Sequence, residues 1–260
     1  MLKKLLKHDF ISVWRLALPT FAIATGIILF SYGMCRIDTD NTALHIFSGV
    51  LFPTGIIVAI VACILVFVLP ILHFYRNLMT GEGYLSFTLP VTTYQLVLSK
   101  LIVGAVTTLF NMAFTVSAIL LIVSSRVDLE LSDLKAILFP GAENATAAIC
   151  LILGTVVVAV IAQQMYFYLA ISLGQMLCKN KIVGSALGYA IIYIATQAVN
   201  LALLLLLTLH LGFKDNLETF MSGVRGITIS VSFVAVEYAI LCIIAYLLSC
   251  RILKNRLNLS

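Results

Sequence analysis

The sequence predicts an all-α, polytopic membrane protein with six transmembrane helices. Hydrophobic residues make up 62% of the 260-residue chain and charged residues only 10%, whereas soluble domains average roughly 45–50% and about 25%. Six apolar runs are each near or above the roughly 20 helical residues that cross about 30 Å of hydrocarbon. They lie at 16–35, 46–73, 100–124, 145–173, 182–210 and 227–249. We therefore expect one transmembrane domain at 16–249, followed by a short tail at 250–260.

Residues 1–15 predict a separate amphipathic helix that lies in the headgroup plane of the membrane. At 100° per residue, its apolar and basic side chains fall on opposite faces. The apolar face carries Leu2, Leu5, Leu6, Phe10 and Val13, and the polar face carries Lys4, Lys7, His8 and Arg15. Asp9 breaks this pattern, because it falls on the apolar side. A simple membrane anchor is one interpretation of this helix.

The basic residues predict which side of the membrane each terminus occupies. An even number of spans places both termini on one side, together with the loop at 74–100. Eleven of the 16 Lys and Arg residues lie on that side and five on the other. Because Lys and Arg gather on the cytoplasmic side, we expect both termini and this loop in the cytoplasm, and the chain in the plasma membrane.

The polar loop at 74–100 predicts a short helix between two rigid helix ends. Glycine costs about 1 kcal/mol in a helix interior, so the segment 80–83, TGEG, is expected to end the preceding helix. Residues 84–89 then allow one or two helical turns before Pro90, which disfavours helical geometry in the residue ahead of it. From chemistry alone, this short helix could equally be an interfacial helix that rests on lipid.

The helix after this loop has a clear start signal. Thr92 and Gln95 fit the N-cap and N3 positions of a capping box. Val91 and Leu96 fit the two positions of a hydrophobic staple around it. The helix is therefore expected to begin at Thr93.

Residues 82–90, EGYLSFTLP, with Lys100 downstream, resemble the first cytoplasmic loop of permeases of ABC transporters of the type 2 (ABC-2-like) export class. Small bacterial six-span permeases are the closest match. The resemblance implies that 84–89 is a coupling helix that docks into an ATP-binding subunit, and that 1–15 is a connecting helix packed near it. The residues it assigns to this coupling are Glu82, Gly83, Tyr84, Leu85, Phe87, Thr88, Leu89 and Pro90.

The resemblance covers this one loop, while span number and topology agree along the chain. It implies cytoplasmic ABC ATPase subunits and a second permease subunit, identical or related, as partners, with ATP and Mg on the ATPase and no cofactor on this chain. No nucleic-acid partner is expected. Loops of the family often carry several charges before the glycine, whereas here only Arg76 and Glu82 are charged.

No catalytic motif occurs in the sequence. It has no GxxxxGK[ST] phosphate-binding loop and no HExxH motif. The four histidines are scattered, and His73 is more simply an interfacial side chain than a metal ligand. We therefore expect no catalytic residues, no metal site and no enzymatic activity in this chain.

Polar side chains inside the spans are candidates for a substrate path. Glu237 lies near the middle of the sixth span, where an ionised carboxylate costs about 3 kcal/mol or more; it is expected to be protonated, paired or in a wet cavity. Amides in the spans could instead join helices through hydrogen bonds worth about 0.6 kcal/mol each. The candidates are Glu237, Gln197, Asn200, Asn111, Gln163 and Gln164.

A small-residue pattern, Gly184 to Gly188, occurs in the fifth span. Small residues spaced by four let two helices approach closely in a membrane. The pattern therefore predicts close helix packing, and Gly184 and Gly188 are candidates for the contact between subunits.

The function we expect is the permease subunit of an ATP-driven ABC exporter, which forms the substrate path and couples to separate ATPase subunits. One alternative is the substrate-binding membrane subunit of an energy-coupled importer, which would not need the EGYL and TLP loop. Another is an ATP-independent carrier or channel, in which Glu237 would titrate with transport. The substrate itself does not follow from the residues.

Overall fold

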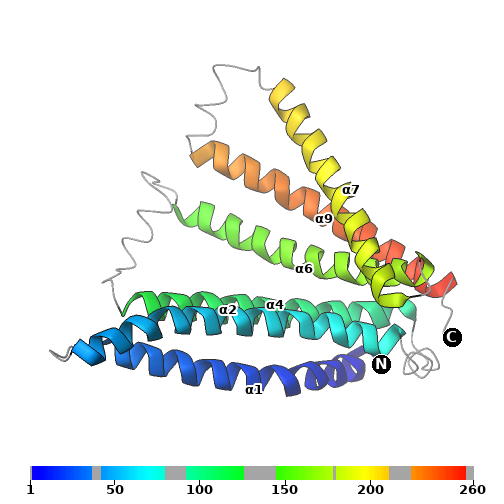
Figure 1. Cartoon of the computed structure of the whole chain (residues 1–260). Coiled ribbons are helices and arrows are strands. Elements are labelled where there is room, and N and C mark those ends of the chain that lie inside the picture. The colour runs from blue at the N-terminus through cyan, green and yellow to red at the C-terminus, as the bar shows by residue number, and fades with distance from the viewer. Residues whose placement is uncertain are drawn as a thin grey trace. The chain divides into compact units, whose positions relative to one another are not determined.

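The computed structural model describes residues 2–36, 42–79, 92–125, 145–177, 180–210 and 224–255, and its elements are all helices (Figure 1). Six of them are long and apolar enough to cross a membrane, so the chain is an all-α, multi-pass membrane protein, as predicted. They are α1 (Leu2–Arg36), α2 (Thr42–Met79), α4 (Thr93–Val123), α6 (Ala145–Leu177), α7 (Lys181–His210) and α9 (Val224–Asn255). The chain divides into two compact units, Met1–Leu134 and Lys135–Ser260, which are described separately.

In the first unit, α1, α2 and α4 pack against one another as a three-helix bundle. Small side chains at the contacts let the helices approach closely, which favours dispersion contacts in a membrane. The buried cluster takes two residues from each helix: Ala24, Ile28, Ala59, Ala62, Ala118 and Ile122. A second cluster centres on Ala17, Phe21 and Val66, with Phe21 also packing against Phe110 and Phe114 of α4.

The N-terminal helix differs from the expected arrangement. Residues 1–15 do not form a helix of their own, because Leu2–Arg36 is one continuous helix of 35 residues (Figure 1). At 1.5 Å per residue it is about 50 Å long, well beyond the 30 Å or so of hydrocarbon. Its first turns are instead part of the bundle: Asp9, Val13 and Ala17 are all buried. Within 1–15, Asp9 and Val13 therefore face protein, while Leu5, Leu6 and Phe10 are half-buried.

The start of α4 confirms the predicted capping signal. The helix begins at Thr93, and Thr92 is its N-cap in an extended conformation. The Thr92 hydroxyl accepts a hydrogen bond of 3.4 Å from the backbone N–H of Gln95. This bond satisfies one of the backbone donors that a helix start leaves without a partner.

In the second unit, α6 packs against both α7 and α9. The contact between α6 and α7 is made by backbone, since Gly174 and Gly184 lie directly against each other. A Cβ atom at Gly188 would lie only 2.8 Å from the carbonyl oxygen of Ala170. The close packing predicted at Gly184 and Gly188 is thus present within the chain. The α6 helix of the same chain accounts for close packing at this pattern, and a contact between subunits at Gly184 and Gly188 stays a prediction.

Gly184→Ala is expected to lower the free energy of unfolding by about 1–3 kcal/mol, because the new methyl group would overlap the Gly174 backbone. Gly154→Ala, one helix away on α6, is the matched control, since a Cβ there has no neighbour within 4 Å. SDS titration of the full chain in mixed micelles measures both variants. Equal stability of the two would show that the α6–α7 contact is looser than described.

Candidate functional site

A buried polar cluster joins the three helices of the first unit around Asp9 of α1. The Asp9 carboxylate is only 2% exposed. It accepts hydrogen bonds from the Ser99 hydroxyl at 2.8 Å and from the Lys100 ammonium group at 3.1 Å. The Nε2 atom of His73 lies 3.1 Å from the same carboxylate. Asp9 thus contacts both α2 and α4, and we call Asp9, His73, Ser99 and Lys100 the Asp9 cluster.

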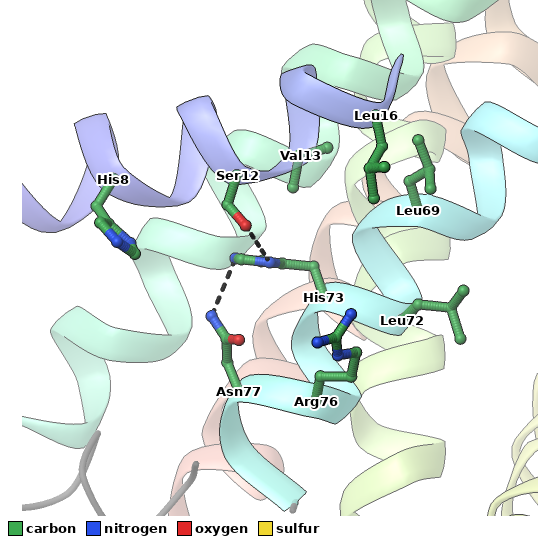
Figure 2. A pocket seen from close by; sticks show the side chains of 9 residues that line it. All are labelled: His8, Ser12, Val13, Leu16, Leu69, Leu72, His73, Arg76 and Asn77. Atoms are coloured by element: carbon green, nitrogen blue, oxygen red, sulfur yellow. Dashed lines mark hydrogen bonds between the residues drawn. The ribbon is translucent and has the colours of Figure 1, made fainter. Parts of the chain in front are cut away.

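His73 extends the cluster along α2. The Ser12 hydroxyl lies 3.4 Å from Nδ1, and the Asn77 side-chain nitrogen lies 3.2 Å from Nε2 (Figure 2). His73 is therefore a member of a network of polar side chains within the first unit.

Opposite charges explain why these side chains can be buried. Lys100 is 4% exposed and Ser99 is fully buried. Removing an ammonium or a carboxylate group from water costs several kcal/mol, which only a close partner with further hydrogen bonds offsets. Asp9 has such partners in Lys100 and Ser99. Its position on the apolar stripe of α1, which broke the amphipathic pattern, is explained by this pairing.

The Asp9 cluster lies beside the two helix ends that flank the predicted coupling loop. His73 is less than two turns before Met79, the last residue of α2, and Lys100 is two turns after Thr93, the first residue of α4. The cluster therefore fastens both helix ends to α1. The predicted coupling residues themselves lie outside the described part of the chain: Glu82, Gly83, Tyr84, Leu85, Phe87, Thr88, Leu89 and Pro90.

A second site, in the second unit, collects three of the predicted substrate-path residues. Gln163, Gln197 and Asn200 line one pocket of about 100 Å³ between α6, α7 and α9. The Gln163 amide donates to the Tyr189 hydroxyl at 3.0 Å, and the Gln197 amide donates to the Tyr193 hydroxyl at 3.1 Å. The described bonds of these two amides therefore go to tyrosines.

The other three predicted path residues lie elsewhere. Asn111 is buried in the first unit, where its amide donates to the Cys63 carbonyl of α2 at 2.8 Å; this bond joins two helices, as the packing interpretation expects. Gln164 is fully buried on α6. Glu237 lines a separate, mainly apolar pocket of about 220 Å³ with residues of α7 and α9. One Glu237 carboxylate oxygen is buried without a hydrogen-bond partner among the described residues.

Sequence reasoning placed Tyr193 one turn before Gln197 on the same face of the fifth span, but it missed the other three tyrosines of the pocket in the second unit. Tyr166, Tyr189, Tyr193 and Tyr238 all line it. The available signal was a polar stripe on α7, in which Tyr189, Tyr193, Gln197 and Asn200 recur every three or four residues. The Asp9 cluster was also missed as a unit, although Asp9 was visible as an anomaly.

Comparisons with protein-family models, with curated proteins and with solved structures give no match to this chain. The described residues contain no group of three or more His, Cys, Asp or Glu side chains that could hold a metal ion.

Proposed function

We propose that this chain is the permease subunit of an ATP-driven ABC exporter. In this proposal it forms the substrate path and couples to separate cytoplasmic ATPase subunits through residues 82–90. One observation carries the proposal. The coupling-like sequence joins the end of α2 at Met79 to the start of α4 at Thr93, and the Asp9 cluster connects both of these helix ends to α1. Six helices able to span a membrane agree with such a subunit.

The Asp9 cluster supports the proposal because a coupling element needs rigid supports. A push on 82–90 reaches α2 and α4 at once, since the chain enters and leaves the loop through them. Asp9 ties both helices to α1 over 3.1 Å contacts, so the three helices would move as one body. Rigid movement of packed helices is a common way to transmit a small shift over a long distance.

The orientation we propose places both termini and the loop in the cytoplasm of a bacterial inner membrane. The excess of Lys and Arg on that side supports it. Among the described residues, the first turns of α1 carry exposed Lys3, Lys4 and Lys7, which fit a cytoplasmic surface.

The test is to purify the tagged full chain from its native membranes with its partners bound. A co-purifying protein with a P-loop sequence and ATPase activity supports the proposal, and so does a neighbouring gene for such an ATPase. A chain that binds a small ligand tightly by itself and brings no ATPase would instead favour the importer subunit and overturn the exporter assignment.

Glu237 is proposed to act on the substrate path. Glu237→Ala is expected to lower substrate-stimulated ATPase activity of the reconstituted complex by about tenfold or more, because it removes the one carboxylate of the described spans of the second unit. Glu237→Gln tests whether the charge or only the polar group matters. Ile243→Ala, at an exposed position on the same helix, is the control. Unchanged stimulation in both Glu237 variants would exclude this role.

Glu237 also favours a second candidate function, an ion-coupled carrier without ATPase partners. A carboxylate oxygen buried beside an apolar pocket is costly and is typical of ion and proton pathways in membranes. Transport by the chain alone in vesicles, driven by a proton gradient and lost in Glu237→Gln, would select this candidate over the exporter.

A further inference from the structure

We propose that the pocket between α1 and α2 binds the headgroup and first acyl carbons of an anionic glycerophospholipid. The pocket has a volume of about 330 Å³ and lies wholly within the first unit. Of its lining residues, Ser12, His73 and Asn77 belong to the polar network around Asp9 described above. The proposal does not depend on the exporter assignment, because a lipid site would exist in any membrane protein with this bundle.

One half of the pocket is polar and basic. His8 and Ser12 line it from α1, and His73, Arg76 and Asn77 line it from α2 (Figure 2). The imidazole of His8 and the guanidinium group of Arg76 can donate hydrogen bonds to a headgroup, and arginine matches the geometry of phosphate oxygens. Ser12 and His73 contact each other within the pocket wall. His8 and Arg76 are solvent-exposed in the bundle and so lie where a headgroup can reach them.

The other half of the pocket is apolar. It is lined by Val13 and Leu16 of α1 and by Leu69 and Leu72 of α2, and Leu16 and Leu69 lie together at one end in Figure 2. These residues belong to, or adjoin, the apolar runs that enter the membrane. The polar-to-apolar change along the pocket therefore follows the change from headgroup to acyl chain across a membrane surface.

The charges around the pocket select an anion. Asp9 is the single acidic residue in the described ranges of the first unit, and its carboxylate is engaged by Lys100, Ser99 and His73. Lys4 and Arg15 are exposed and share the basic side of α1 with His8. A site with basic donors and an apolar half suits an anionic lipid better than a zwitterionic one.

The apolar half also decides between two sources of phosphate. A free phosphate ion would use only the basic side chains and leave Leu16, Leu69 and Leu72 without a ligand. A phospholipid uses both halves and arrives by diffusion in the plane of the membrane. The proposal is therefore a lipid site, and a free-phosphate site is an outcome of the test that would overturn it.

Native mass spectrometry of the delipidated full chain tests the proposal. The chain is given equal amounts of phosphatidylglycerol and phosphatidylcholine with identical acyl chains, with and without inorganic phosphate. We expect a preference for phosphatidylglycerol that Arg76→Gln lowers about fivefold, and that His8→Gln also lowers. Arg251→Gln removes an exposed charge at the end of α9, outside the pocket, and should keep the full preference.

Three results would overturn the lipid site. The first is no preference for phosphatidylglycerol in the unmodified chain, and the second is an undiminished preference in both Arg76→Gln and His8→Gln. The third is displacement of the lipid by millimolar inorganic phosphate, which would indicate a site for the ion alone. Because both substituted side chains are exposed, the variants are expected to fold, and a thermal melt without lipid checks this.

Discussion

Asp9→Ala is expected to lower the free energy of unfolding of the chain by about 3–5 kcal/mol. The substitution leaves the Lys100 ammonium group buried at 4% exposure without the carboxylate that it contacts at 3.1 Å. It also removes the acceptor for the Ser99 hydroxyl and for His73. A buried charge that loses its partner is among the most destabilising changes known for single residues.

A double variant separates the stability lost in Asp9→Ala from the net contribution of the ion pair to the free energy of unfolding. Asp9→Ala combined with Lys100→Met removes both charges and should recover most of the stability, because an apolar replacement of a buried pair is often neutral. Lys4→Ala, at an exposed position on α1, is the surface control and should stay within about 0.5 kcal/mol of the unmodified chain. SDS titration in mixed micelles measures all three.

Two outcomes of that experiment would count against a buried ion pair between Asp9 and Lys100. A loss below about 1 kcal/mol in Asp9→Ala would mean that water reaches Lys100 in the membrane-embedded protein, as it reaches surface ion pairs. No recovery in the double variant would mean that Asp9 acts through Ser99 or His73 rather than through the charge of Lys100.

The helices could be predicted from the sequence because each depends on residues close together in the chain. Length and hydropathy gave all six spans, and the capping residue Thr92 gave the start of α4. Residues 1–15 are helical as predicted, but they continue into the first span as one helix, Leu2–Arg36. Asp9 on their apolar stripe was the sign of a contact with another helix, because a carboxylate in an apolar face needs a buried partner.

The polar sites could not be predicted in the same way, because their partners are distant in sequence. Asp9 is separated from His73 by 64 positions and from Lys100 by 91. Periodicity within one helix shows that Asp9 needs a partner but not which helix provides it. Likewise, the sequence shows the polar stripe of α7 around Gln197. Only the packed structure shows that Gln163 of α6 lines the same pocket.

Leu85→Asp or Phe87→Asp is expected to abolish co-purification of the proposed ATPase while leaving membrane insertion intact. An apolar side chain that fills a pocket at the centre of an interface contributes about 2–4 kcal/mol, and an aspartate there would also bury a charge. Binding should therefore weaken by about 30-fold or more. Retention of the ATPase on tagged full chain, measured by ATPase activity in the eluate, gives the result.

The controls make this prediction specific to the loop. Leu257→Asp makes the same substitution in the tail, on the same proposed side of the membrane, and should retain the ATPase. If it also loses the ATPase, a negative charge anywhere on that surface is sufficient and the loop has no special role. If Leu85→Asp and Phe87→Asp both keep a functional complex, residues 84–89 are not the docking helix. The lipid-resting helix that chemistry alone allows would then be the better interpretation of this segment.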